Sequence, residues 1–184
     1  KVETVLDRSG LKRDSYSGKS LRHILESLPR EDLLQGSEDE LFQIATGILD
    51  LRQRAHTRLF MRRDRYGRFF VCLVYVPRER FNTQVRERIE ALLGETLRAE
   101  QIDSSVQLGE AALARLHLVL RPKIGDHPEF DLAALEGQVA ALVRNWHDEV
   151  RDALIALRGE HEGVVLANRF ARSLPAAYVD DVSP

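Results

Sequence analysis

The chain has 184 residues, of which 43% are hydrophobic and 30% charged, and its formal net charge is -2. This composition is that of a soluble globular domain, and it lacks the strongly basic balance of most nucleic-acid-binding domains. The longest apolar run, Phe69 to Val76, is far shorter than the ~18 residues that a membrane helix needs. Cys72 is the only cysteine, which excludes an internal disulfide and fits a reducing, cytoplasmic setting.

The N-terminal end of the chain shows no apolar signal segment. The chain begins at Lys1, and its only methionine is Met61. We therefore expect a piece excised from a longer protein. A mature chain whose leader has been removed is the alternative.

Residues 1–36 are predicted to form an N-terminal extension with one short helix. Val2–Leu6 is expected to be a short strand or the tail of a preceding element. The polar, glycine-containing run that follows predicts a loop. Ser20–Leu28 then predicts a helix, which Pro29 stops.

Residues 37–121 are predicted to form one α+β domain. A capping box at Ser37 and Glu40, followed by apolar residues at helical spacing, predicts a helix to about Arg54. Asn82 or Thr83 is expected to cap a second helix. The predicted strands are residues 58–63, 69–76, 104–108 and 113–120.

Strand 69–76 is apolar on both faces, which predicts a central strand that is covered on both sides. Helices are expected to cover one face, and more of this chain or a partner the other. The order helix, strand, strand, helix, strand, strand indicates a ferredoxin-like antiparallel sheet with two helices on one face. Strand 113–120 is expected to fill a central place in it.

Residues 122–184 are predicted to form a helical segment after a short linker. Asp131 is expected to cap a long helix that runs to about Arg158, with apolar residues in near-heptad steps. Gly159 breaks this pattern. A last helix is predicted over residues 160–172.

Charge is distributed unevenly along the chain. Residues 51–100 hold 12 arginines, no lysine and six acidic residues, a balance of +6, whereas the remainder holds 15 basic and 23 acidic residues, a balance of -8. Such a charge dipole can steer a partner or join two copies.

Motifs for catalysis or cofactor binding are weak in this sequence. The run SGKS at Ser17–Ser20 lacks the first glycine of a phosphate loop, so a helix start is the preferred interpretation. The six histidines are scattered, and none forms an i, i+4 pair, so no metal site is expected. We predict no catalytic, cofactor-binding or metal-binding residues.

The turn between strands 58–63 and 69–76 is the remaining candidate site, because arginines crowd it and Asp64 is the only acidic residue near in sequence. We expect it to contact acidic groups of another domain or subunit. A solvated turn is one alternative, and an RNA-binding face is another, since YGRFFVCLVY partly matches the aromatic box of RNA-recognition motifs. The candidate interface residues are Arg58, Arg62, Arg63, Asp64, Arg65 and Arg68.

Several long motifs resemble the N-terminal region of the large bacterial NAD-specific glutamate dehydrogenases. The resemblance rests on LPREDLLQGSEDEL and on RLFMRRDRYGRFFVCLVYVPRERFNTQVRERIEALL, with further similarity in WHDEVRDAL and FARSLPAAYVDDVSP. It covers most of the chain from about Ser20. The long middle motif is specific, because chance agreement over that length is remote.

The resemblance implies a role. The parent enzyme converts L-glutamate to 2-oxoglutarate and ammonium with NAD, and its catalytic and NAD-binding parts lie outside this segment. The matched region implies ACT-type modules of the ferredoxin-like kind, which pair between copies and commonly bind amino acids. The expected partners are therefore other domains and copies of the parent, with an amino acid as the candidate effector, but no nucleic acid and no membrane.

We therefore interpret the chain as a non-catalytic regulatory or assembly segment of such an enzyme. The alternative from another class is a stand-alone RNA-binding module with a ferredoxin-like fold. A small enzyme is the third and least favoured interpretation.

Overall fold

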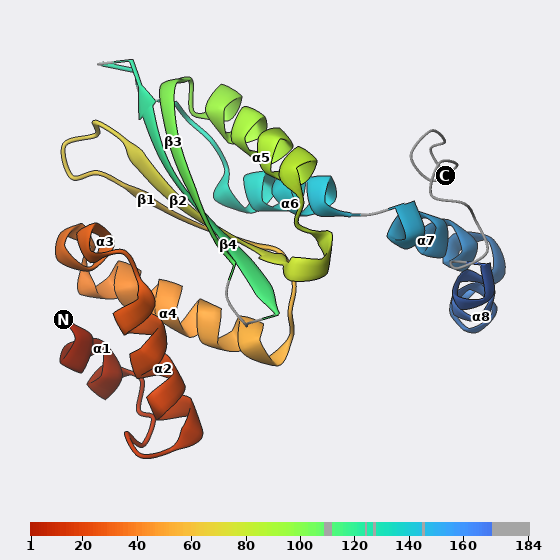
Figure 1. Ribbon diagram of the computed structural model, residues 1–184, viewed down its shortest axis with the longest axis horizontal. Coiled ribbons are helices and arrows are strands. Elements are labelled where there is room, and N and C mark those ends of the chain that lie inside the picture. Colours follow the sequence, from red (N-terminus) through yellow and green to blue (C-terminus); the bar gives the residue numbers. More distant parts are fainter. Residues whose placement is uncertain (109–111, 124, 127, 145, 171–184) are drawn as a thin grey trace. The chain divides into compact units, whose positions relative to one another are not determined.

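The computed structural model of the chain contains eight α-helices and a four-stranded sheet within the residues that it describes (Figure 1). These residues are 1–108, 112–123, 125–126, 128–144 and 146–170. The chain divides into two compact units, residues 1–140 and 141–184, and each is described by itself. None of the described helices has both the length and the apolar character needed to cross a membrane.

Four helices precede the sheet. Ser15 caps α2, because its hydroxyl accepts a hydrogen bond from the Gly18 N–H, and Ser37 and Glu40 form the predicted capping box of α4. Of the two alternatives for Val2–Leu6, the short strand is wrong, because this segment belongs to a helix whose Val5 and Leu6 are buried. The four helices are α1 (Val2–Arg8), α2 (Tyr16–Ser27), α3 (Arg30–Gln35) and α4 (Glu38–Gln53).

The sheet is antiparallel, with the strand order β1-β2-β4-β3. Its strands are β1 (Arg58–Arg63), β2 (Phe70–Pro77), β3 (Ala99–Leu108) and β4 (Leu113–Pro122). The ferredoxin-like prediction is confirmed, and β4 fills a central place as expected. The strand at one edge, β1, comes first in the chain, whereas the usual order ends with that strand.

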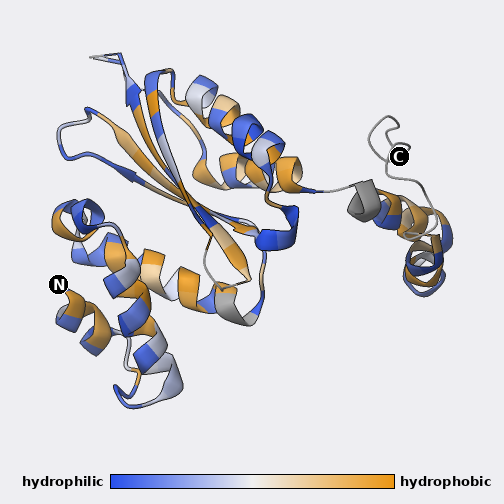
Figure 2. Cartoon of the chain, viewed as in Figure 1, coloured by the Kyte–Doolittle hydropathy of each residue, from blue (hydrophilic) through white to orange (hydrophobic). Residues whose placement is uncertain are grey.

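Two helices cover one face of the sheet (Figure 1). Asn82 caps α5 (Thr83–Thr96) after a short 3-10 helix, η1 (Arg78–Arg80), and α6 (Leu132–Val143) follows β4. This face of the sheet carries alternate residues of β2 and β4, among them Cys72 and its partner Leu118. Ile89 of α5 and Leu135 of α6 are buried as well. Figure 2 shows α6 as largely hydrophobic.

The first four helices lie on the opposite face. Their apolar side chains form one buried cluster with Phe60, Leu73 and Tyr75 of the sheet. Strand β2 is therefore buried along its whole length, as its apolar faces predicted. The correction concerns α4, which was expected beside α5 but packs with α1 and α2 on the other face. More of this chain covers the second face, so that layer needs no partner.

The second unit contains α7 (Trp146–Arg158) and α8 (Glu160–Phe170), joined at Gly159, whose φ is +80°. The break at Gly159 was predicted. The single helix predicted from Asp131 to Arg158 is wrong, since α6 ends at Val143 and α7 begins at Trp146. The apolar pattern continues across the break between α6 and α7, so the sequence did not predict this break. The predicted helical residues 171–172 lie outside the described residues.

Gly47 lets α4 approach the sheet closely. A Cβ atom at Gly47 would lie 2.6 Å from the ring of Phe60, whereas a Cβ atom at Gly137 in α6 would meet nothing within 4 Å. We expect Gly47→Ala to lower the free energy of unfolding by about 1–3 kcal/mol through overpacking. Gly137→Ala, the matched control, should raise it by about 0.5–1 kcal/mol, because alanine favours helices. Urea unfolding of both variants measures this, and a stabilised Gly47→Ala would contradict the close approach.

Candidate functional site

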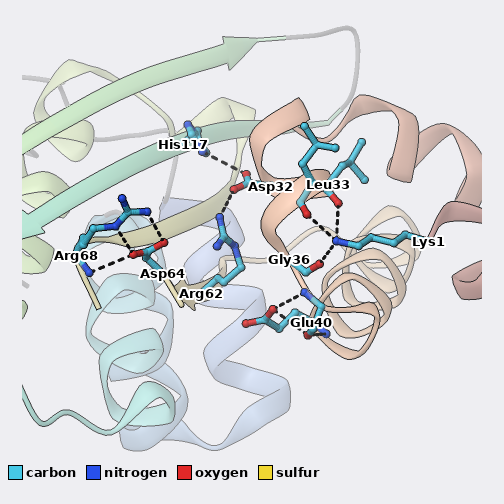
Figure 3. Close-up of polar contacts among 11 residues, drawn as sticks. Lys1, Asp32, Leu33, Gly36, Glu40, Arg62, Asp64, Arg68 and His117 are labelled. Carbon is cyan, nitrogen blue, oxygen red and sulfur yellow. Dashed lines mark hydrogen bonds and ion pairs between the residues drawn. The ribbon is translucent and has the colours of Figure 1, made fainter. Parts of the chain in front are cut away.

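The arginine-rich turn joins β1 to β2 and is built around the carboxylate of Asp64 (Figure 3). Oδ2 accepts hydrogen bonds from the backbone N–H of Tyr66 at 3.2 Å and of Arg68 at 3.3 Å. The Arg68 guanidinium donates to Oδ2 through Nε at 2.8 Å and to Oδ1 through Nη2 at 3.2 Å. Gly67 adopts a φ of +69°, which glycine takes without strain. The turn is therefore fixed by its own residues.

Hydrogen bonding by the Arg68 side chain lowers the pKa of Asp64 to about 2, with the two backbone N–H groups acting in the same direction against burial. The folded-state pKa lies below the ordinary value of 3.8, so the unfolded chain binds this proton more readily. The carboxylate therefore stabilises the fold above about pH 4. This contribution is lost as the pH falls towards 2.

We expect the free energy of unfolding to decrease between about pH 4 and pH 2, and Asp64→Asn to flatten that part of the profile. The amide cannot titrate, and it accepts fewer of the hydrogen bonds. Urea unfolding at stepped pH measures both profiles. Glu87→Gln on the exposed side of α5 is the control and should keep the wild-type slope. An unchanged slope in Asp64→Asn would show that Asp64 does not cause the loss of stability at low pH.

A second polar cluster lies between α3 and the sheet. Arg62 of β1 donates from Nη2 to Oδ1 of Asp32 at 2.9 Å, and both side chains are only 6% exposed. His117 of β4 brings Nε2 to within 3.4 Å of the other carboxylate oxygen of Asp32. Figure 3 shows Asp32 between these two side chains. The cluster ties the helical layer to the sheet.

Burial alone would raise the pKa of Asp32, but the contacts with His117 and Arg62 outweigh it, so this pKa lies below its ordinary value. Asp32 is therefore ionised and pairs with the buried guanidinium. Among the residues that the structure describes, neither Asp32 Oδ2 nor His117 Nε2 has another hydrogen-bond partner. When Nε2 carries a proton, each of these two atoms is the polar partner of the other.

The candidate arginines do not form one exposed group. Arg58 lies 3.4 Å from Glu136 of α6, and its guanidinium is 5.9 Å from the ring centre of Phe60. The guanidinium of Arg63 lies 5.6 Å from the ring centre of Phe70. Asp64 was expected to be the only counter-charge near in sequence, and the structure adds Asp32 and Glu136 from distant segments.

Burial also sorts the candidates into two classes. Arg62 and Asp64 are buried, so they hold the fold and the turn together instead of facing a partner. Arg65 is exposed, and the side chain of Arg68 is 63% exposed although it is bound to Asp64. Tyr66, which is 76% exposed, joins them at the end of the turn.

A groove of about 670 Å³ opens beside β1, between α4 and the start of α6. Glu136 lies in it and accepts a hydrogen bond from the backbone N–H of Leu59 at 2.9 Å, on the side of β1 that faces away from β2. We call it the acidic groove, because four carboxylates and one arginine line it. These charged residues are Glu40, Asp50, Asp131, Glu136 and Arg58.

The RNA-binding alternative is not supported by the sheet. Phe70, which the aromatic box would expose for base stacking, is buried and packs edge-to-face on Phe130. The run at Ser17–Ser20 is helical, so the helix-start interpretation holds, although α2 begins earlier, after Ser15. Burial raises the pKa of the Cys72 thiol, which makes it unreactive. Among the described residues, no cluster of potential metal ligands occurs.

Three family models match this chain. A model of the glutamate dehydrogenase ACT2 domain matches residues 58–147, and models of glutamate dehydrogenase helical motifs 1 and 2 match residues 1–54 and 153–184. The chain belongs to the glutamate dehydrogenase family. The ACT2 match contains the whole sheet with α5 and α6, and the first helical-motif match contains α1 to α4. These ranges differ from the predicted division at residues 36 and 121.

Curated relatives match the chain over most of its length. The NAD-specific glutamate dehydrogenase of Halomonas elongata is 42% identical over all 184 residues, and that of Pseudomonas aeruginosa is 36% identical over the same length. The enzyme of Mycobacterium tuberculosis is 28% identical over 92% of the chain. The resemblance seen in the motifs is confirmed. The chain spans about 11% of the length of each relative.

Proposed function

We propose that the chain is a non-catalytic segment of an NAD-dependent glutamate dehydrogenase and acts in the assembly or regulation of that enzyme. The observation that carries the proposal is the match of the sheet and its helices to the ACT2 domain. The parent reaction converts L-glutamate and NAD to 2-oxoglutarate, ammonium and NADH. NAD binds to other parts of the parent, which works in the cytoplasm.

The partners in this proposal are other domains and other copies of the parent. The exposed arginines of the turn, Arg65 and Arg68, are the residues of this chain that face them, together with Arg58 and Arg63 nearer the sheet. Arginine suits this role, because its planar guanidinium pairs with carboxylates in two parallel hydrogen bonds. An amino acid is the effector class that an ACT-type domain suggests.

The chain by itself is expected to form no NADH from glutamate. The physical reason is that glutamate oxidation needs a bound dinucleotide beside the substrate, and the sequence carries no dinucleotide-binding fingerprint. Absorbance of NADH at saturating glutamate and NAD measures this. The enzyme of Halomonas elongata is the positive control. Turnover that follows the concentration of the purified chain would overturn the non-catalytic proposal.

A further inference from the structure

The hairpin tip, defined as Arg65, Tyr66 and Arg68, has the chemistry of a docking anchor. The Tyr66 ring is 76% exposed, and the guanidinium of Arg68 lies 5.2 Å from its centre. Tyrosine and arginine carry much of the binding energy at protein interfaces. Because Asp64 already holds the turn, docking costs little conformational entropy.

The acidic groove offers the complementary chemistry. Its four carboxylates against one arginine give a charge of -3, whereas the turn, with Arg63, Arg65 and Arg68 against Asp64, carries +2. Apolar side chains line the groove as well, among them Ile44 of α4. Its volume of about 670 Å³ is enough for an aromatic side chain and a guanidinium.

The tip of the described chain does not line its own groove. The groove borders the first residues of β1, Arg58 to Met61, and the tip follows the last residue, Arg63. From Met61, the last groove residue of β1, to Arg65 is four residues, which span about 13 Å in extended chain, and pairing with β2 as far as Arg63 holds the turn beyond the end of β1. The tip is therefore free to meet the groove of a second copy.

We propose that the hairpin tip of one copy docks in the acidic groove of a second copy. Tyr66 lies against the apolar lining, and the Arg65 guanidinium pairs with Asp50. Asp50 is the suitable partner, because the other carboxylates already have structural bonds: Glu40 caps α4, Asp131 binds the Ala133 N–H, and Glu136 binds Leu59. This contact rests on the proposed role in assembly and gives it a specific surface.

Each copy carries one tip and one groove, so each copy can insert its tip into one neighbour and accept a tip in its groove. Two such contacts around a two-fold axis close a dimer, whereas a single contact per copy builds a chain of copies. In either case association depends on charge, since the two surfaces have opposite sign. It weakens as salt shortens the screening length.

Sedimentation velocity of the 184-residue chain, over concentrations up to a few hundred micromolar, tests the contact. We expect self-association with a Kd on the order of 10–100 µM, as for a small interface, and weaker association at ~500 mM than at ~50 mM NaCl. Tyr66→Ala and Arg65→Glu should each raise Kd at least about tenfold, as loss of an interface anchor does. Asp50→Arg should do the same.

A charge exchange makes the test specific. The double variant Arg65→Glu with Asp50→Arg should return Kd to within about threefold of wild type, because the pair is restored with its signs reversed. Arg88→Glu on the exposed side of α5 is the control for net charge and should leave Kd unchanged. Circular dichroism confirms that each variant is folded.

A chain that stays monomeric over the whole concentration range would overturn the proposal. Association whose Kd the tip and groove variants leave unchanged would also overturn it and would point to another surface, such as the exposed edge of β3. A double variant with a Kd as high as that of the single variants would overturn it too. Failure here is separate from failure of the proposed function, since removal of the whole segment from the full-length enzyme can still change assembly or regulation.

Discussion

Arg62→Ala is expected to lower the free energy of unfolding by about 3–5 kcal/mol, the largest effect of any single substitution in the polar clusters. The substitution leaves the buried carboxylate of Asp32 without the donor at 2.9 Å, and only the contact with His117 remains. An ionised group that has lost its buried partner is costly because water cannot replace the partner.

Urea unfolding followed by circular dichroism measures the change. Arg65→Ala is the matched control, since its side chain is exposed at the turn, and it should change the free energy of unfolding by less than about 0.5 kcal/mol. The double variant Arg62→Met with Asp32→Leu should recover much of the loss, because an apolar pair removes both charges together. A loss below about 1 kcal/mol for Arg62→Ala would mean that water reaches Asp32.

Ile89→Ala is expected to cost about 2–5 kcal/mol, since truncation of a buried aliphatic side chain removes apolar contacts and leaves a cavity. Ile89 is fully buried on the face of α5 that packs on the sheet, together with Val85 and Leu93. The effect tests the face assignment of the helix. It also tests whether α5 is part of the core instead of part of a binding surface.

Glu87→Ala provides the comparison within the same helix. The Glu87 side chain is 63% exposed, and its loss should cost less than about 0.5 kcal/mol. Thermal or urea unfolding of the two variants in parallel gives the difference directly. Equal losses would show that α5 packs by a different face in solution.

Much of the fold was predictable because its signals are local. The capping box of α4, the Asn82 cap of α5, the alternation along β4 and the two apolar faces of β2 each depend on neighbours in sequence, so these helices and strands could be predicted. The layer arrangement was less accessible. Helix α4 has one apolar face that fits either side of the sheet, and only the packing of α1 and α2 beside it decides the side.

The candidate site shows the same division. The hydrogen-bond partners of the Asp64 carboxylate are at most four residues away in sequence, and Gly67 predicted the turn. The pairing of Arg62 with Asp32 and His117 joins three distant segments, so no local pattern identified it. One signal was present: Arg62 and Phe60 are two residues apart in β1, and strand alternation places both on the same face. An arginine that shares a face with a core phenylalanine needs a buried counter-charge.

The most direct test of the central claim uses the Halomonas elongata enzyme with its matched segment replaced by this chain. The measurement is sedimentation velocity of that chimera against the same enzyme with the segment replaced by a flexible linker. A role in assembly predicts that the chimera sediments like the wild-type enzyme and that the linker variant forms a smaller species. An unchanged sedimentation coefficient in the linker variant, with an unchanged response of NADH formation to amino acids, would contradict the claim.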